Sequence, residues 1–579
     1  MCGIVGVVGA GASRERVERM ADRLVHRGPD DAGIWGTPGV WLGHRRLSIL
    51  DLSAAGRQPM TFQECAIVYN GEIYNYRELR RELPGPFVSN TDTEVLLHLY
   101  VRDGERCVES LRGMFAFAIW DAGKRRLFAA RDRLGIKPFH YLESAEGFAF
   151  ASEIKGLSDF ARGDLDRTAL VDYLTYKYVP TPKSIYSSIR KLPPAHTLSF
   201  DGRVSLRRYW SPEPSEIRSD PETTLEELRP LLRDCVRSHT LSDVPLGVFL
   251  SGGVDSTTLV ANLEHPKTFT VGFDVGEHSE APHARRVAEH FGCEHREETV
   301  LGFDVEEALD AIPRMYDEPF GDSSAWPTYI VSKMARGGVK VALSGEGGDE
   351  VFSGYGWYRK WQELHSRRSA RVLASLLPPF SPAGRSLHRR GARELDRYAA
   401  LVGAFTLPQL RRILAPGFLD EEYDPLEHLR SRWREDLEPV KRMQWADLHT
   451  FLPDDLLVKV DRASMAVSLE VRPPLLDHRL VEFALTLDPK LLRDAERGKL
   501  LLRRTMEGLV PAEVLARPKK GFSMPVRKWL RDRPDLLRGA FVRLARAGVL
   551  RSSRPPRLDG EQMWTLLVLD RWWSHGRPT

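Results

Sequence analysis

Two short segments of the 579-residue chain carry residues whose types and spacing suit catalysis. Cys2 follows the initiator methionine, and removal of that methionine would leave a thiol and a free α-amino group on one residue. An α-amine titrates near pH 8 (about 7.7–8.0), so it can act as the general base for its own thiol. The sequence therefore predicts a cysteine nucleophile at the amino terminus. The alternative for an isolated Cys2 is a small, inert, buried residue.

The second segment is Leu250–Ser256, with the sequence LSGGVDS, which lies between an apolar run and a helical pattern. A strand-to-helix turn of this kind presents backbone N–H groups to an anion, and its glycines let the backbone approach a phosphate. Ser251 and Ser256 can donate hydroxyl hydrogen bonds, and Asp255 is a candidate Mg²⁺ ligand. The GxxxxGK[ST] pattern of a Walker A loop is absent. A phosphate site of another kind is expected.

Two domains are expected because 579 residues exceed what one hydrophobic core supports. The first 155 residues or so alternate short apolar runs with turn residues, which is typical of strands. The expected strands are Ile4–Val8, Val40–His44, Ala66–Tyr69, Phe115–Trp120, Arg126–Ala130 and Phe148–Ala151, and the expected helices are Ser13–Leu24 and Thr91–Val101. Thr91 and Glu94 have the spacing of a capping box at the start of the second helix.

Beyond about residue 222 the pattern alternates strands with helices. The expected order is a strand at Leu246–Leu250, a helix at Thr257–Leu263, a strand at Thr268–Gly272, a helix at His283–Phe291 and a strand at Val339–Leu343. This alternation predicts a doubly wound parallel sheet, followed beyond about residue 355 by a mostly helical part. A stretch rich in Pro, Ser and Glu near 210–221 separates the halves. The expected domains are therefore residues 2–210, with a connector, and residues 222–579.

Several classes of protein do not fit the composition. The net charge is only +4, and the arginines crowded between positions 367 and 412 are more typical of solvated helix faces than of a nucleic-acid site. The five cysteines are scattered and form no CxxC pair, so neither a disulfide framework nor a zinc site is expected. No apolar run reaches the roughly 18–20 residues of a membrane span, and no basic region precedes the first apolar segment. A cytoplasmic enzyme without nucleic-acid or membrane partners is expected.

Six segments of the N-terminal half resemble the glutaminase domain of class II glutamine amidotransferases. In chain order they are Met1–Gly6, His26–Asp31, Arg46–Ile49, Asn70–Asn75, Thr91–Glu94 and Arg131–Pro138. The resemblance implies an N-terminal-nucleophile (Ntn) hydrolase with an αββα sandwich fold. It also implies that Cys2 attacks the side-chain amide of glutamine and forms a γ-glutamyl thioester, which water later releases.

The same resemblance implies roles for individual residues. Asn70 and the backbone N–H of Gly71 would stabilise the tetrahedral oxyanion. An arginine fork suits the α-carboxylate of glutamine, which implies Arg46, and a carboxylate suits its α-ammonium, which implies Asp92 with Glu72 nearby. The residues implied to bind glutamine are Arg46, Leu47, Ser48, Ile49, Leu50, Asn70, Gly71, Glu72 and Asp92.

Each of these residues also has an ordinary structural alternative. Asn70-Gly71 between two strand-like runs is a common hairpin turn. Asp92 at the first helical position favours the helix dipole whatever its function. Arg46 beside Arg45 could be an exposed surface residue. The ordered set of matches favours the functional interpretation.

Leu250–Ser256 resembles the pyrophosphate loop of N-type ATP pyrophosphatases, which adenylate their substrates. Asp317–Phe320, Ser344–Glu350, Lys459–Met465 and Leu469–Arg472 also match asparagine synthetases, so the resemblance spans nearly the whole chain. The implied ATP contacts are Leu250, Ser251, Gly252, Gly253, Asp255, Ser256, Val271, Ser344 and Gly345, and the implied Mg²⁺ ligands are Asp255 and Asp349. Glu346 is implied to support acyl-adenylate formation. Lys519, or its neighbour Lys520, is implied to neutralise phosphate charge.

The resemblance thus implies a glutamine-dependent asparagine synthetase that uses ATP, Mg²⁺, glutamine and aspartate. Two departures from the usual family segments, at Pro473–Leu475 and at Gly321–Ser324, concern the acceptor half. They keep open the alternative of a related amidotransferase that acts on a peptide or a modified amino acid. A glutaminase without synthetic activity and a binding protein that uses the arginine-rich helices are further alternatives. The oligomeric state stays open, with a homodimer as one option.

Overall fold

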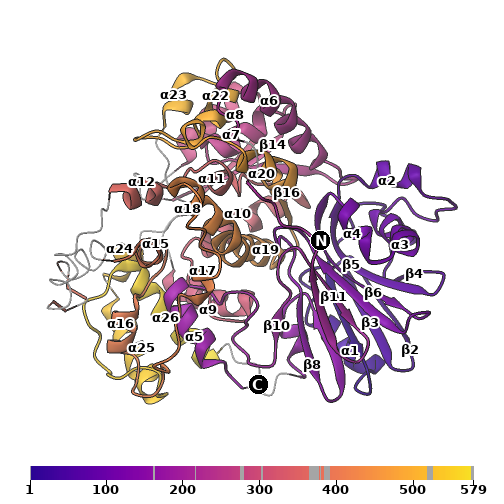
Figure 1. Cartoon of the computed structure of the whole chain (residues 1–579), viewed down its shortest axis with the longest axis horizontal. Coiled ribbons are helices and arrows are strands. Elements are labelled where there is room, and N and C mark those ends of the chain that lie inside the picture. Colours follow the sequence, from indigo (N-terminus) through magenta and orange to yellow (C-terminus); the bar gives the residue numbers. More distant parts are fainter. Residues whose placement is uncertain are drawn as a thin grey trace.

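The computed structural model divides into a β-rich N-terminal half and a larger C-terminal half built around a parallel sheet (Figure 1). It describes residues 2–160, 164–214, 217–273, 280–300, 304–363, 377–378, 380–381, 383, 392–517, 526–531 and 533–575. The combination of antiparallel sheets with a helix-covered parallel sheet confirms the predicted fold class.

Two six-stranded antiparallel sheets form the N-terminal half. The first has the order β10-β8-β9-β1-β3-β2, and the second has the order β12-β11-β7-β6-β5-β4. The strands are β1 (Gly3–Val8), β2 (Asp31–Thr37), β3 (Val40–Arg46), β4 (Met60–Phe62), β5 (Cys65–Ile73), β6 (Gly113–Asp121), β7 (Arg126–Arg131), β8 (His140–Ser144), β9 (Gly147–Ala151), β10 (Arg190–Lys191), β11 (His196–Phe200) and β12 (Val204–Arg208).

Helices cover the outer faces of both sheets, which completes the expected αββα sandwich. Ile4, Leu42 and Phe150 of the first sheet pack against the inner face of the second sheet. On the outer faces lie α1 (Arg14–Asp22) and α3 (Asp92–Asp103). Because both faces are covered, β1 is buried along its whole length and shows no alternation. The remaining helices of this half are α2 (Tyr76–Glu82), α4 (Cys107–Ser110) and α5 (Arg167–Tyr176).

The start of α3 differs from the predicted capping box. Thr91 caps the helix, because its hydroxyl accepts a hydrogen bond from the N–H of Glu94 at 3.3 Å. The Glu94 carboxylate, however, accepts from the N–H groups of Val88 and Ser89, both at 2.7 Å, and holds the preceding loop. The Thr91 hydrogen bond of the expected capping box is therefore present, whereas the Glu94 side chain stabilises the loop before the helix instead of bonding to the N–H of Thr91.

The C-terminal sheet is parallel and has the order β15-β14-β13-β16-β17. Its strands are β13 (Leu246–Phe249), β14 (Lys267–Phe273), β15 (Glu294–Val300), β16 (Val341–Leu343) and β17 (Glu470–Arg472). The order reverses between β13 and β16, and ligands of such sheets bind at the carboxyl ends of the strands at this point. The doubly wound arrangement is therefore as predicted. Strand β17 was not predicted, because Leu469–Arg472 was identified only by its resemblance to asparagine synthetases.

Helices surround this sheet and make up the rest of the half. They are α6 (Pro221–Ser238), α7 (Val254–Ala261), α8 (Ala281–His290), α9 (Val305–Tyr316), α10 (Ala325–Arg336), α11 (Gly348–Val351), α12 (Gly356–Glu363), α15 (Glu394–Val402), α16 (Leu407–Ile413), α17 (Glu427–Arg430), α18 (Pro439–His449), α19 (Leu457–Met465), α20 (His478–Leu485), α21 (Pro489–Leu492), α22 (Leu500–Thr505), α23 (Ala512–Ala516), α24 (Val526–Leu530), α25 (Pro534–Arg546) and α26 (Gly560–His575). Among the described helices, none is long and apolar enough to span a bilayer.

The chain crosses between the halves more than once. Helix α5 lies between β9 and β10 in sequence, but in space it lies among the C-terminal helices, beside α26 (Figure 1). The Tyr173 hydroxyl of α5 donates to the carbonyl of Thr565 in α26 at 2.8 Å. The two halves also meet in a small hydrophobic cluster, where Leu47 and Ile49 of the N-terminal half pack against Val341 of β16 and Met465 of α19. The segments that carry the predicted glutamine residues therefore lie against the C-terminal half.

Candidate active sites

Cys2 is buried immediately before β1, with 8% of its surface exposed. Its backbone N–H donates to Asn70 Oδ1 at 2.9 Å, and its carbonyl accepts from Arg27 Nε at 3.1 Å. Burial raises the pKa of the thiol, and a hydrogen bond from the backbone of Leu47 opposes that rise. The thiol therefore needs a base to ionise, and the α-amine on the same residue is a suitable one.

Asn70 and Gly71 lie inside β5, where they pair with Ala116 and Phe115 of β6. The hairpin-turn interpretation of this dipeptide is therefore wrong. Asn70 is fully buried, and its Nδ2 has no hydrogen-bond partner among the residues that the structure describes. A buried donor beside a nucleophile is the feature expected of an oxyanion hole. Gly71 is required by packing, because a Cβ there would lie 2.3 Å from the carbonyl oxygen of Met114.

Arg46 is buried at the end of β3, so the surface-arginine interpretation is also wrong. Its Nη1 donates to the carbonyl of Ser53 at 3.0 Å, and its Nη2 donates to those of Leu50 and Asp51 at 3.2 and 2.5 Å. These bonds fold the loop after β3 around the guanidinium. Ser48 in the same loop is fixed by its N–H, which donates to Asp30 Oδ2 at 2.8 Å.

Two buried acids lie near this loop and β5. Asp92 Oδ2 accepts from the Tyr69 hydroxyl at 2.7 Å and from the N–H of Ile73 at 2.9 Å. Glu72 Oε2 pairs with Arg472 Nη2 at 2.8 Å, while its Oε1 is buried without a partner. Burial raises the pKa of both carboxyls; Arg472 opposes that rise at Glu72, and the hydrogen bonds from Tyr69 and Ile73 oppose it at Asp92. The predicted glutamine residues thus lie together around Cys2.

Arg27 is a buried residue whose role the sequence did not indicate. Besides Cys2, its guanidinium binds Glu153 Oε1 at 2.7 Å and both oxygens of Asp461, at 2.8 and 3.1 Å. Asp461 lies on α19 of the C-terminal half. The backbone of Cys2 is therefore tied through one side chain to the other half of the molecule. The partners are 434 positions apart, so no local pattern could have paired them.

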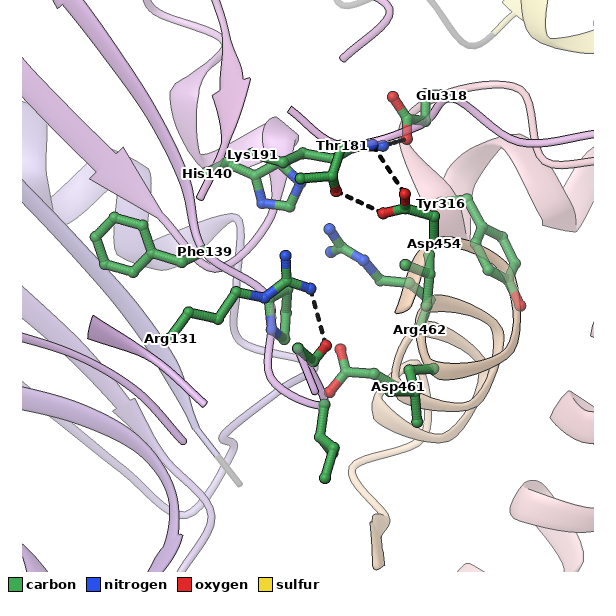
Figure 2. Close-up of a pocket in the computed structure, with 15 residues that line it drawn as sticks. Arg131, Phe139, His140, Thr181, Lys191, Tyr316, Glu318, Asp454, Asp461 and Arg462 are labelled. Atoms are coloured by element: carbon green, nitrogen blue, oxygen red, sulfur yellow. Dashed lines mark hydrogen bonds and ion pairs between the residues drawn. The ribbon is translucent and has the colours of Figure 1, made fainter. Parts of the chain in front are cut away.

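Figure 2 shows the polar pocket that adjoins this ion pair, between the two halves. Arg131, His140 and Lys191 enter it from the N-terminal half, and Asp461 and Arg462 enter it from α19. Lys191 forms an ion pair with Glu318 across the pocket. The N-terminal and C-terminal halves thus share a lining of charged side chains.

The predicted phosphate loop connects β13 to α7, as expected. The hydroxyls of Ser251 and Ser256 lie 3.1 Å apart, and Ser251 Oγ accepts from the N–H of Gly253 at 3.2 Å. Gly252 has φ of +66°, and a Cβ there would lie 2.6 Å from the backbone of His283. The loop conformation therefore requires glycine at this position.

The Ser344–Glu350 segment follows β16 and lies directly over the phosphate loop. A Cβ on Gly345 would lie 2.8 Å from that of Asp255, and a Cβ on Gly348 would lie 2.4 Å from Asp255 Oδ1. The Ser344 hydroxyl is buried without a partner. The two segments that resembled ATP-binding loops are thus in contact at the reversal of the strand order.

Lys499 occupies the centre of this region, although the sequence gave no indication of it. Its Nζ forms ion pairs with Asp255 and with Asp349, the latter at 2.7 Å. The two predicted Mg²⁺ ligands therefore lie close enough to share one cation. A cavity of about 510 Å³ opens beside them, lined by the phosphate loop and by Lys499, Arg503 and Arg517. Arg517 Nη1 also donates to the carbonyl of Ser251 at 2.9 Å.

The other predicted ATP residues lie at different depths. The side chains of Leu250 and Val271 are buried in the hydrophobic core, so only their backbones can face a ligand. The pairing of β13 with β14 ends at Phe249 and Phe269, which leaves the backbone of Val271 beyond the end of β13. Lys519 and Lys520 lie outside the described residues.

Glu346 lies on the Ser344–Glu350 loop and is partly exposed. Its charge acts on the buried ammonium of Lys459. Burial would lower the pKa of Lys459, but Asp322, at 3.4 Å, and Glu346 outweigh it and raise the pKa. Asp455 is buried nearby, and burial together with the charge of Asp322 raises the pKa of its carboxyl well above the usual range. A second charged cluster therefore adjoins the phosphate region on the side of α19.

The Arg27 cluster predicts a large loss of stability when its cation is removed. Burial alone would raise the pKa of Glu153 and Asp461; Lys155 and Arg462 lower that of Glu153, and Arg27 lowers that of Asp461. Arg27→Met removes the guanidinium that holds both oxygens of buried Asp461 and one of the cations around Glu153, which should lower the free energy of unfolding by about 3–5 kcal/mol. Arg45→Met is the control, because Arg45 pairs with the exposed Asp22 and should cost about 0–1 kcal/mol. Urea denaturation measures both, and equal losses would contradict the prediction.

Comparisons with known proteins agree with this geometry. A family model described as asparagine synthase matches residues 227–572, and one described as a glutamine amidotransferase domain matches residues 1–210. Asparagine synthetase [glutamine-hydrolyzing] 1 of Bacillus subtilis is 35% identical to this chain, and the match covers 92% of this chain and 88% of the relative. Asparagine synthetase [glutamine-hydrolyzing] 3 of the same organism is 32% identical, and that match covers 90% of this chain and 87% of the relative. Amidase chry2 of Gibberella zeae is 30% identical over 89% of this chain and 86% of its own.

Cys2 lies beside the buried side-chain amide of Asn70, and Asp255 of the phosphate loop shares the ammonium of Lys499 with Asp349. The chain belongs to the asparagine synthase family and carries a glutamine amidotransferase domain at its N-terminus.

Proposed function

We propose that the chain is a glutamine-dependent asparagine synthetase. Ammonia released from glutamine at Cys2 would displace AMP from a β-aspartyl adenylate, giving asparagine, glutamate, AMP and pyrophosphate. The observation that carries the proposal is the presence of two separate reaction sites, one at Cys2 and one between the SGGVDS and GEGGDE loops, in a molecule whose halves share a buried interface.

In the first reaction, the α-amine of Cys2 takes the thiol proton, and Sγ attacks the side-chain amide carbon of glutamine. The unpartnered Nδ2 of Asn70 supports the developing oxyanion. Its Oδ1 is already bound to the Cys2 nitrogen, so one amide group would orient the base and stabilise the intermediate. Ammonia leaves, and water then hydrolyses the thioester to glutamate.

Glutamine recognition would rest on the charges around this point. The unpartnered Oε1 of Glu72 and the carboxyl of Asp92 suit the α-ammonium of glutamine. Arg46 uses Nη1 and Nη2 to hold the loop 50–53, which leaves Nε for the α-carboxylate. Leu47–Leu50 would frame the substrate through the backbone that this arginine organises.

In the second reaction, a carboxylate oxygen of aspartate attacks the α-phosphorus of ATP and pyrophosphate leaves. The phosphate loop would bind the leaving group through its N–H groups and the hydroxyls of Ser251 and Ser256. Lys499, Arg503 and Arg517 line the adjoining cavity and would neutralise its charge. Ammonia then attacks the acyl carbon, and AMP leaves with the bonding electrons.

Mg²⁺ fits the residues present. Among the described residues, no cluster of three or more His, Cys, Asp and Glu forms a ready-made metal site. Mg²⁺ is usually held by one or two carboxylates together with substrate phosphates, and Asp255 and Asp349 already converge on one ammonium. When bound there, the ion would neutralise phosphate charge. Lys499 would then release both carboxylates and turn toward the phosphates.

Further parts of the proposal extend beyond these contacts. The domains are assigned to residues 2–210 and 222–579, and we place the enzyme in the cytoplasm, with a homodimer as a candidate assembly. The similarity to amidase chry2 favours keeping a second candidate, an amidotransferase for another carboxylate. The acceptor that yields AMP distinguishes the two candidates.

Replacing Cys2 with alanine tests the proposal most simply. Wild-type protein with glutamine, Mg-ATP and aspartate should release AMP and asparagine in equal amounts. Cys2→Ala should lose glutamine-dependent synthesis but keep synthesis from ammonium, because the second site is separate. Production of glutamate without AMP or asparagine would remove aspartate as the acceptor and favour the second candidate.

Asn70→Ala should lower the kcat of glutamine hydrolysis by about 10²–10³-fold, because it removes an oxyanion donor. Asn75→Ala is the matched control, since Asn75 belongs to the same segment but its side-chain amide, among the described residues, bonds to the backbone of Ser110 and Arg112 alone. Glutamate release, measured at saturating glutamine, compares the two variants. A loss at Asn75 as large as that at Asn70 would contradict the assignment.

A further inference from the structure

Arg472, the last residue of β17, is fully buried and holds groups from several parts of the chain. Its Nη2 binds Glu72 at 2.8 Å, and its Nε binds Glu470 at 2.6 Å. Its Nη1 donates to the carbonyls of His239 and Leu241, at 2.9 and 2.6 Å. Four N–H groups of this guanidinium are therefore engaged, and one of them crosses to the N-terminal half.

The backbone of Arg472 belongs to the synthetic site. Its carbonyl accepts from the N–H of Ser344 at 2.9 Å, at the start of the loop that covers the phosphate loop. The segment after Arg472 supports the same loop, because a Cβ on Gly347 would lie 2.1 Å from Leu476 Cδ2. A shift of the 344–348 loop therefore has to move β17 or break this contact.

The side chain of Arg472 belongs to the glutamine site. Glu72 directly follows Gly71, and among the described residues its second oxygen, Oε1, has no hydrogen-bond partner. Glu470 lies close enough to Cys2 that its charge adds to the rise in the pKa of the thiol, which burial dominates. One residue thus touches the adenylate-forming loop with its backbone and the glutamine-binding acid with its side chain.

We propose that Arg472 is a positioning residue that couples glutamine binding to occupancy of the synthetic site. The inference rests on the proposed function. Ligands that order the 344–348 loop would fix β17, and the guanidinium would then hold Glu72 in the orientation that receives the α-ammonium. Because buried Glu72 cannot give up its cation without a large penalty, the bridge moves as one unit. Linkage requires the converse effect as well: glutamine strengthens binding at the synthetic site by the same factor.

The test compares the KM for glutamine, from glutamate release, with and without Mg-ATP and aspartate. In wild-type protein these ligands should lower that KM at least fivefold, within the roughly 5–150-fold range of such couplings. Arg472→Lys keeps one positive charge but cannot hold all four acceptors. For Arg472→Lys we expect the KM for glutamine, measured without Mg-ATP and aspartate, to rise about tenfold, while kcat changes less than threefold. Adding Mg-ATP and aspartate should then lower that KM less than twofold.

Two further variants complete the test. Arg543→Lys is the matched control, because Arg543 binds the buried Asp570 in the C-terminal helices at 2.8 and 2.6 Å, and its response should equal that of wild type. If Arg472→Lys does not fold, the combined variant Glu72→Gln, Glu470→Gln and Arg472→Met removes the three charges of the bridge together and should also lose the response.

The coupling is overturned if Mg-ATP and aspartate do not change the KM for glutamine of the wild-type protein. It is also overturned if they lower the KM of Arg472→Lys, or of the combined variant, as much as they lower that of the wild type. Failure of the proposed function is recorded separately, as absence of asparagine from glutamine in the wild-type protein. Synthesis from ammonium, measured in parallel, shows whether the synthetic site of each variant is intact.

Discussion

Buried charge at the contact between the halves is the constraint on which the rest of the structure depends. Arg27 and Arg472 are both fully buried, and each binds acids from both halves. Neither half could bury its own share of these charges alone without a large desolvation penalty. Cys2, Glu72 and the edge strand β17 of the parallel sheet are therefore held in one arrangement.

Much of the fold was predictable because the patterns that specify it are local. The apolar run before Leu250–Ser256 identified β13, and the alternation around it predicted the parallel sheet. Several exposed or glycine-containing strands, such as β2 and β12, were missed because they lack a continuous apolar run. Strand β17 was missed because two of its three residues, Glu470 and Arg472, are charged and it forms no apolar run.

The site was predictable where a residue's role depends on its own segment. Cys2, Asn70, Arg46 and Asp92 do lie together, and the two glycine-rich loops do meet. Arg27, Lys499 and Arg472 were missed because their partners lie hundreds of positions away and depend on how the halves pack. The bonds that Arg46 makes to backbone carbonyls follow from loop conformation, which residue types alone do not specify.

Tracing nitrogen from glutamine into the product tests the central claim most directly. Protein is incubated with amide-¹⁵N-glutamine, Mg-ATP and aspartate, and the asparagine formed is analysed by mass spectrometry beside the AMP released. A two-site synthetase predicts ¹⁵N in the side-chain amide of asparagine and one AMP for each asparagine. Labelled free ammonia with no labelled asparagine, or asparagine without AMP, would contradict it.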